Sequence, residues 1–387
     1  MFSSRVPGDL TANRLTRAIE RVRAAGGRIL DLTATNPTTA AIPYPDSMLA
    51  ALADSRALHY EPAPLGLAAA RAAVANDYLR HGINVAPDAV VLTASTSEAY
   101  SLLFKLLCEP AGDAVMLPVP SYPLFDHLTR LDGITPIPYR LEYHGRWGID
   151  FDSLDSGWTD RVRAVLAVSP NNPTGTTLTD TECAALSERC ADREAALVID
   201  EVFADYPLTS TAAITQGGSR DCLTFHLGGL SKAAGLPQVK LGWIVVDGPE
   251  PVTRAALARL ELICDTYLSV STPVQIAAPA LIAAGSEVRA AIRQRLRTNE
   301  TELRRMTAAY SSIEVLPCEA GWSAVLRVPS TRSEEDLVVE LLERDGVLVH
   351  PGFFFDFPHE AFLIVSLLPE GRTFADGIGR ILERARA

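Results

Sequence analysis

The sequence predicts an α/β protein with a large domain built on a mainly parallel sheet and a smaller α+β domain. Three observations predict this fold class. Short apolar runs alternate with helical patterns between residues 90 and 230, which is the rhythm of βαβ units. The pattern changes near residue 285, where a long charged helix is expected. The chain has 387 residues, of which 48% are hydrophobic, and this is enough for two coupled domains with ample cores.

The expected large domain spans residues 45–285, and its elements alternate between strand and helix. Each apolar run ends in turn-forming or polar residues. The expected strands are Val90–Thr93, Ala114–Leu117, Val162–Val168, Ala196–Ile199 and Cys222–Leu227, and the helices after the first two are Ser97–Cys108 and Phe125–Leu131. Parallel sheets bind ligands beyond the carboxyl ends of their strands, so the polar residues that follow these strands are the candidates for chemistry.

The expected small domain combines residues 1–44 with residues 286–387. An N-terminal helix is expected within residues 11–26, because apolar residues recur at helical spacing and two glycines can end it. A long arginine-rich helix is expected over Ala284–Ala309, and the domain boundary is expected inside it. Strand-like runs at Ala324–Val328 and Leu363–Leu367 then flank the helix Glu334–Asp345.

The composition disfavours several classes of protein. The 35 basic and 47 acidic side chains give a net charge of −12 without a basic block, which disfavours nucleic-acid binding. The apolar stretches are too short to span a membrane, and no secretory signal is expected. The six cysteines form no CxxC pair and are expected to be reduced and mostly buried, in a cytoplasmic protein. The seven histidines lack metal-ligand spacing, so no metal site is predicted.

Two segments after expected strands carry charged side chains. Gly229–Leu236 places Lys232 among small residues, and a lysine held away from water has a lowered pKa and can form an imine. The alternative is a surface lysine in a loop whose glycines serve the turns. Asp200 follows the run Ala196–Ile199, where a half-buried carboxylate needs a cationic partner. The alternative there is an aspartate that caps a loop.

Two further segments carry hydrogen-bond donors. Ser169–Gly175 contains two asparagines whose amides can donate to a ligand oxygen, although the same residues also form plain turns. At the turn from a strand into a helix, the hydroxyls of Ser95, Thr96 and Ser97 lie beside free backbone N–H groups. This arrangement suits a phosphate, and it equally suits simple capping of the helix.

The order and spacing of these four segments resemble the fold-type I aminotransferases of class I and II, which use pyridoxal 5′-phosphate (PLP). Asn-Pro-Thr-Gly, then Asp-Glu-Val-aromatic, then Ser-Lys-x-x-Gly-Leu is a specific combination, and the resemblance spans nearly the whole chain. It implies a large domain with a seven-stranded type of sheet and a homodimer with a shared active site. It also implies transfer of an amino group between an amino acid and a 2-keto acid.

The resemblance also implies the role of each site residue. Lys232 forms the internal aldimine and then moves a proton between the substrate and the cofactor, and Asp200 keeps the pyridine nitrogen protonated. Asn172 donates to the phenolic oxygen. The remaining cofactor contacts that the resemblance implies are Ser95, Thr96, Ser97 and Lys240 at the phosphate, Tyr122 (with Phe125 as the fallback) and Phe203 at the ring, and Tyr60 at the phosphate of the neighbouring subunit's cofactor.

Four positions depart from the pattern of that family. Phe203 replaces a tyrosine that donates to the phenolic oxygen, and Lys240 replaces an arginine at the phosphate. Thr35 stands where a glycine is usual in the N-terminal substrate loop. Ile364 stands where an arginine usually binds the substrate α-carboxylate, and a buried carboxylate without a partner is costly. The candidate replacements for that arginine are Arg14 and Arg372.

The missing arginine leaves a second function open. A PLP-dependent lyase or cyclase could use the same scaffold with altered recognition of the carboxylate. A third class, a PLP-binding sensor without catalysis, usually carries a DNA-binding domain and fits an acidic chain poorly. Three other segments are weaker candidates: Trp322 belongs either to the core or to the substrate pocket, His350–Phe354 resembles a loop at the substrate entrance, and Tyr267–Gln275 resembles a stretch that lines the pocket on the dimer side.

Overall fold

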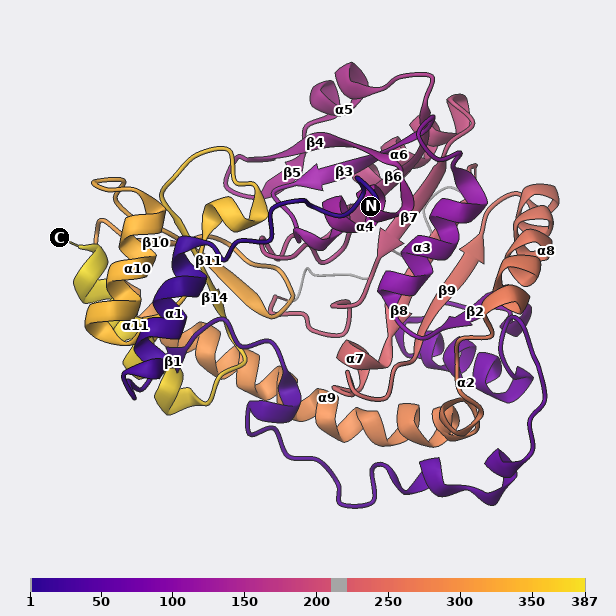
Figure 1. Cartoon of the computed structure of the whole chain (residues 1–387), viewed down its shortest axis with the longest axis horizontal. Helices are drawn as coiled ribbons and strands as arrows, with labels where there is room; N and C mark the ends of the chain where they lie inside the picture. The colour runs from indigo at the N-terminus through magenta and orange to yellow at the C-terminus, as the bar shows by residue number, and fades with distance from the viewer. Residues whose placement is uncertain (1, 210–220, 387) are drawn as a thin grey trace.

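The computed structural model describes residues 2–209 and 221–386 and is built around two sheets (Figure 1). The larger sheet has eight strands in the order β2-β9-β8-β7-β6-β3-β4-β5, and the smaller one has four in the order β10-β11-β14-β13. The predicted α/β fold class, with a large mainly parallel sheet and a smaller α+β part, is confirmed. The two sheets fall on either side of residue 285, but the predicted domain limits themselves stay a prediction.

The central strands of the large sheet, from β8 to β4, run parallel, while β9 and β2 pair antiparallel at one edge. The strands are β2 (Val90–Thr93), β3 (Ala114–Val119), β4 (Thr135–Tyr143), β5 (Trp147–Ile149), β6 (Val162–Val168), β7 (Ala196–Asp200), β8 (Thr224–Gly229) and β9 (Gly242–Asp247). The expected sheet had seven strands. The eighth is β5, which folds back on β4 through a turn where Gly145 takes a φ of 83°.

Helices cover both faces of the large sheet because its strands are apolar on both sides. Val115 and Leu117 of β3 pack with α3, α4 and α8 on one face, whereas Met116 packs with α5 and α6 on the other. The helices of this part are α2 (Ala68–Tyr78), α3 (Thr96–Leu107), α4 (Leu124–Asp132), α5 (Phe151–Gly157), α6 (Asp180–Asp192), α7 (Leu230–Ala233) and α8 (Glu250–Tyr267). The α3 and α4 helices agree with the predicted ranges to within one residue at each end.

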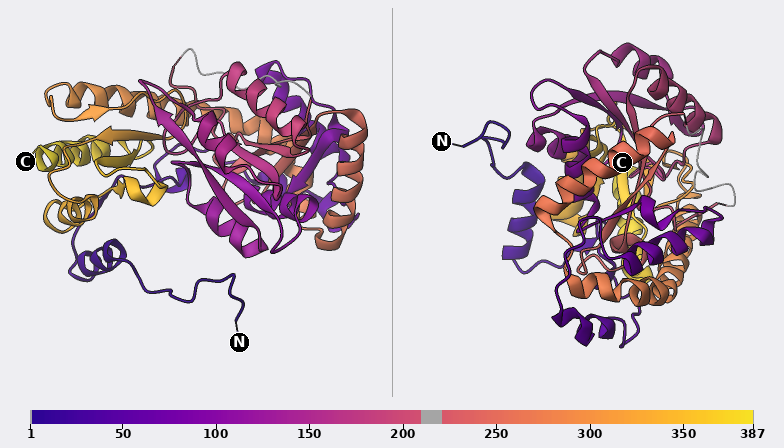
Figure 2. Two further views of the ribbon diagram at one scale, coloured as in Figure 1. Left: turned by 90° about the horizontal axis from the view of Figure 1, so that it is seen from above. Right: turned by 90° about the vertical axis from the view of Figure 1, so that its right-hand side faces the viewer.

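The small sheet is antiparallel and lies at the opposite end of the molecule from α8 (Figures 1 and 2). Its strands are β10 (Glu314–Val315), β11 (Ser323–Arg327), β13 (His350–Pro351) and β14 (Phe362–Ser366). A separate parallel pair joins β1 (Leu30–Asp31) to β12 (Val347–Leu348). The helices beside these strands are α1 (Arg14–Ala24), α10 (Glu334–Asp345) and α11 (Gly371–Ala385). The pairing of β1 with β12 shows that the N-terminal segment joins the C-terminal part of the chain.

The long helix α9 (Thr272–Thr307) runs beneath both parts and packs against α2, α7 and α11 (Figure 1). It begins 12 residues before the predicted start at Ala284, and the prediction was wrong there. The segment Ile276–Ala284 is apolar on all sides and contains Pro279, so its sequence lacks the polar face that marks an amphipathic helix. Burial of Ala277, Ala278 and Leu281 makes it helical nonetheless.

Short 3₁₀ turns complete the described chain. They are η1 (Pro37–Thr39), η2 (Ala50–Ala53), η3 (Ser55–Leu58), η4 (Leu79–His81), η5 (Pro87–Ala89) and η6 (Gly352–Phe355). All six cysteines are buried and free of disulfides, as expected. Across residues 2–209 and 221–386, no helix is both long and apolar enough to cross a membrane.

Glu334 links the η6 turn to the small sheet through hydrogen bonds to both. Its carboxylate is 2% exposed and accepts hydrogen bonds from Phe353 N at 2.9 Å and from Phe362 N at 2.7 Å. Replacing it with alanine leaves both half-buried N–H groups without this partner, so Glu334→Ala is expected to lower the free energy of unfolding by about 3 kcal/mol. Urea unfolding measures this change.

The matched control is Glu335→Ala on the same turn of α10. The side chain of Glu335 is 42% exposed and lies 3.5 Å from Arg14 in a surface ion pair, so its loss should cost less than about 0.5 kcal/mol. If the two variants lost the same free energy of unfolding, the proposed role of the Glu334 hydrogen bonds in stability would be contradicted.

Candidate active site

A cavity of about 350 Å³ lies between the carboxyl ends of the parallel strands and the small sheet. The large sheet contributes Val168 at the end of β6 and Asp200 at the end of β7, and Lys232 follows β8 in α7. The small sheet contributes four further lining residues: Ser323, His350, Ile364 and Ser366. This is the place where an open parallel sheet is expected to bind a ligand.

Lys232 is held against two aromatic rings inside this cavity. Its Nζ lies 4.5 Å from the centroid of Trp322 and 5.3 Å from that of Phe203. Burial lowers the pKa of Lys232 from 10.5 to about 8, and the negative charge of Asp200 partly opposes this shift. A usable fraction of the amine is therefore unprotonated at neutral pH and can attack a carbonyl carbon.

Asp200 presents a buried carboxylate at the end of β7. Its Oδ2 accepts a hydrogen bond from Tyr100 Oη at 2.9 Å, and its Oδ1 accepts one from Val202 N at 3.1 Å. Burial raises the pKa of Asp200 to about 6, while these two bonds and Lys232 act in the opposite direction. The group is mostly ionised at pH 7 and suits a cationic ligand atom. Sequence reasoning missed Tyr100, although its place one helical turn beyond Thr96 was an available signal.

Only some of the residues predicted to bind the phosphate line the cavity. Thr96 and Ser97 line the cavity, but the Oγ of Ser95 accepts a hydrogen bond from Glu98 N at 3.1 Å and caps the helix. The β9 backbone lies against this turn, because a Cβ on Gly242 would come within 3.1 Å of Thr96 N. Lys240 is exposed just before Gly242 and does not line the cavity.

The predicted ring-binding residues do meet in the cavity. Asn172, Tyr122 and Phe203 line it, as does the fallback Phe125. The neighbouring Asn171 is committed to the fold, because its Nδ2 donates to Thr174 Oγ1 at 2.9 Å and to Pro120 O at 3.1 Å. Asn172 is thus the asparagine that can face a ligand.

Trp322 belongs to the core rather than to the cavity lining. It is nearly fully buried, and its ring packs edge-on against Phe203 at 5.5 Å and against Tyr206 at 5.1 Å. Lys232 Nζ also lies over this ring, so Trp322 packs against the amine and helps to fix its position.

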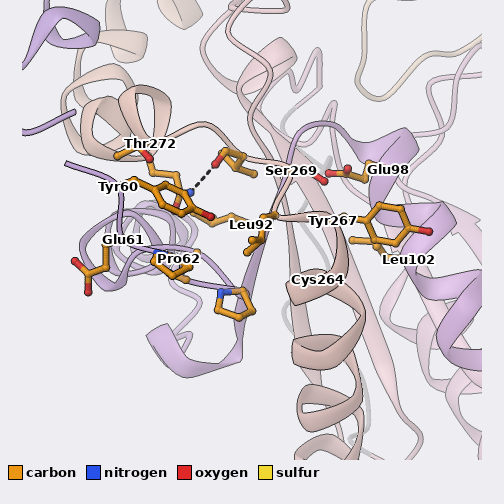
Figure 3. A pocket seen from close by; sticks show the side chains of 16 residues that line it. Tyr60, Glu61, Pro62, Leu92, Glu98, Leu102, Cys264, Tyr267, Ser269 and Thr272 are labelled. Atoms are coloured by element: carbon orange, nitrogen blue, oxygen red, sulfur yellow. Dashed lines mark hydrogen bonds between the residues drawn. The ribbon is translucent and has the colours of Figure 1, made fainter. Parts of the chain in front are cut away.

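Tyr60 lies in a second, smaller pocket and does not reach the cavity of its own chain (Figure 3). This pocket also contains Tyr267 at the end of α8, Val270 in the link between the helices and Gln275 in the first turn of α9. Figure 3 shows Tyr60 and Tyr267 on opposite sides of it, with Leu92 between them. Tyr60 is 63% exposed, which leaves its ring accessible to another protein chain.

Neither predicted replacement for the missing arginine reaches the cavity. Arg14 lies on the outside of α1, where its side chain is 44% exposed and pairs with Asp336 at 2.5 Å. Arg372 is exposed at the start of α11. Ile364 does line the cavity, at the position where the arginine was expected. Among the described residues that line it, the basic side chains are Lys232 and His350. The expectation for Arg14 and Arg372 was wrong, because local sequence does not show which side of a helix faces a distant sheet.

Comparison with known proteins decides the family. A family model described as aminotransferase class I and II matches residues 28–371. The chain belongs to this family. It is 27% identical over 379 residues to an alanine aminotransferase of Mycobacterium tuberculosis, which covers 93% of this chain and 86% of that protein. It is 24% identical over 364 residues to a glutamate-pyruvate aminotransferase of Escherichia coli, and the match covers 90% of this chain and 88% of that protein.

A solved structure of this aminotransferase fold agrees over the whole chain. An alanine aminotransferase from Pyrococcus furiosus superposes with a TM-score of 0.88 at 22% identity and covers 99% of each chain. Its agreement supports the fold. The family match and the named relatives favour transamination and do not favour the lyase or cyclase alternative.

Proposed function

We propose that this aminotransferase moves an amino group between an amino acid and a 2-keto acid through PLP bound covalently to Lys232. One observation carries the proposal: the cavity at the strand ends holds a buried lysine of lowered pKa together with a buried carboxylate. An imine-forming amine and a partner for a ring nitrogen are what this cofactor requires from a protein.

The polar groups of the cavity match those of PLP. The cofactor has an aldehyde, a pyridine nitrogen and a phenolic oxygen, for which Lys232, Asp200 and Asn172 offer an amine, a carboxylate and an amide. Its phosphate would meet the hydroxyls of Thr96 and Ser97 and the free N–H groups at the start of α3. The residues present therefore fit the group.

When bound, PLP supplies an electron sink next to the substrate Cα. The side chains of the cavity supply proton transfer, a partner for the ring nitrogen and protection from water. The Lys232 amine, held against Trp322, would take the proton from the substrate Cα and deliver it to the cofactor carbon that accepts the amino group, because it is the amine that lines the cavity and its pKa is lowered to about 8. Asp200 would hold a proton on the pyridine nitrogen through a charge-assisted hydrogen bond. The apolar rings around Lys232 keep water away from its amine.

The cavity favours a substrate with one carboxylate. Its wall near the small sheet includes Ile364, Phe354 and Phe355. Among the described lining residues, the basic side chains are Lys232 and His350, so a second carboxylate on the substrate side chain would lack a cationic partner and its burial would be costly. We therefore propose a donor with a small uncharged side chain, for which L-alanine is the first probe. The alanine aminotransferase relatives support this choice.

We further propose a cytoplasmic homodimer. The ring of Tyr60 and the side chains of Leu58 and Tyr267 are exposed in one region, and exposed apolar groups of this size favour a protein interface. In the dimer, Tyr60 would reach the cofactor phosphate of the neighbouring subunit. None of the six buried cysteines forms a disulfide, which supports a reducing compartment.

A spectroscopic half-reaction tests the reaction type. Holoenzyme is mixed with L-alanine alone, and we expect the cofactor to convert to its amine form with one keto acid released per site. A 2-keto acid added afterwards should reverse the spectral change. Release of ammonia with an unchanged cofactor spectrum would contradict transamination.

The pH dependence of cofactor attachment tests the environment of Lys232. Because the pKa of Lys232 is lowered to about 8, about one tenth of the amine is free at pH 7, and the attachment rate should rise with pH and level off above pH 8. Apoprotein is incubated with PLP, trapped with borohydride and analysed by peptide mass spectrometry. A rate that still rises above pH 10, or labelling at another lysine, would contradict the assignment.

A further inference from the structure

His350 lies directly beside the position where the carboxylate-binding arginine is missing. In the small sheet, β13 pairs antiparallel with β14, and the register places His350 opposite Ile364. Opposed residues of an antiparallel pair project from the same face. Both side chains line the cavity. The imidazole therefore occupies the same wall from which an arginine at position 364 would project.

The imidazole has an unused polar atom in that wall. Nδ1 of His350 is buried and has no hydrogen-bond partner within residues 2–209 and 221–386. A buried polar atom without a partner is costly, so such atoms are rare unless a ligand or water completes them. The two serines on the same face are already engaged: Ser366 Oγ donates to Ala34 O at 2.6 Å, and Ser323 Oγ donates to Asn172 Oδ1 at 3.4 Å.

Two phenylalanines hold the ring in place. The centroid of His350 lies 5.9 Å from that of Phe354 and 5.8 Å from that of Phe355. Burial lowers the pKa of His350, although Asp31 opposes this shift, so the ring is neutral at pH 7 and carries one N–H. In the tautomer that carries this N–H on Nδ1, the ring offers a hydrogen-bond donor to an anionic oxygen.

The ligand group that His350 meets belongs to the substrate rather than to the cofactor phosphate. The turn predicted to bind the phosphate lies at the start of α3, next to the large sheet, whereas His350 lies in β13 of the small sheet. Resting on the function proposed above, we infer that His350 donates a hydrogen bond from Nδ1 to the substrate α-carboxylate and takes the place of the absent arginine.

The test compares two probes that differ only in the carboxylate. L-alanine and ethylamine are titrated into holoenzyme, and the dissociation constant is followed on the cofactor absorbance. His350→Leu keeps the bulk and removes the donor, so it should weaken L-alanine binding by about 10- to 100-fold and leave ethylamine binding unchanged. His350→Asn places an amide N–H near the position of Nδ1 and should restore most of the L-alanine affinity. The control is His144→Leu, an exposed histidine outside the cavity.

The outcomes separate this inference from the proposed function. If the wild-type enzyme binds L-alanine and His350→Leu weakens both probes equally, the histidine is structural and the inference is overturned. Unchanged L-alanine binding in that variant overturns it as well. A wild-type enzyme whose cofactor responds to no amino acid overturns the proposed function itself. Loss of affinity for L-alanine alone, with recovery in His350→Asn, supports the inference.

Discussion

Replacing Lys232 with alanine is expected to lower kcat for amino transfer by at least about 10⁴-fold. The substitution removes the covalent attachment of the cofactor and also the base that moves the proton at Cα, and proton transfer alone contributes about 10²- to 10⁴-fold. No other lysine lines the described cavity to take over either task. Single-turnover absorbance with L-alanine measures the rate.

Two controls separate this chemical effect from a loss of structure. Lys105 is an exposed lysine on α3 that pairs with Asp132 at 2.7 Å, and Lys105→Ala should leave the rate within about twofold, since surface substitutions have small effects. A small external amine such as methylamine would fit the space vacated in Lys232→Ala and should recover part of the rate. If Lys232→Ala kept more than a tenth of the wild-type activity, the assigned base would be wrong.

Replacing Asp200 with alanine is the second large effect, with an expected loss in kcat of about 100- to 1,000-fold. The carboxylate lies at the end of β7 with Tyr100 and Val202 as donors, so it is oriented before a ligand arrives. Loss of one such preorganised electrostatic partner typically costs a factor of this size. Steady-state kinetics on the folded variant measures it.

The matched variant is Tyr100→Phe, which removes one donor to Asp200 and keeps the charge. It should cost less than about tenfold, because a single hydrogen bond contributes about 1 kcal/mol. A cofactor analogue methylated on its pyridine nitrogen carries a permanent positive charge and should recover part of the activity of Asp200→Ala. No recovery would show that Asp200 acts in another way.

The raised pKa of Asp200 gives this site a pH dependence of known sign. Burial moves the pKa from 3.8 to about 6, so the carboxylate of the apoprotein is ionised above pH 6 and becomes neutral as the pH falls through that value. Cofactor affinity should therefore be lower at pH 5 than at pH 7.5 in the wild type. Asp200→Ala should lose most of this difference.

Local sequence patterns predicted most of the fold and the chemical groups of the site. Apolar runs that end in polar residues correctly indicated β2, β6 and β7, because a strand buried on both faces must be apolar throughout. The prediction was wrong where a pattern depends on distant partners. The segment Ile276–Ala284 of α9 has no polar face, and burial of Ala277, Ala278 and Leu281 makes it helical. The strand β5 is short and forms by pairing with β4.

The site residues also fall into those whose position followed from sequence order and those whose position did not. Lys232, Asp200 and Asn172 follow strands that end at one edge of a sheet, so their meeting in one cavity followed from sequence order. Ser95 belongs to one of these segments but does not line the cavity, because its Oγ caps α3. Lys240 lies beyond the lysine segment and is exposed outside the cavity.

The sequence by itself determined that the chain is an α/β aminotransferase with a lysine, an aspartate and an asparagine at successive strand ends. The resemblance of its motifs also placed Ile364 where the family's arginine is expected. Only the tertiary structure decided what stands in its place. His350 and Ile364 are 14 residues apart, and the antiparallel register of β13 and β14 brings them side by side on one wall. That register arises from pairing between strands, which no local pattern of either strand specifies.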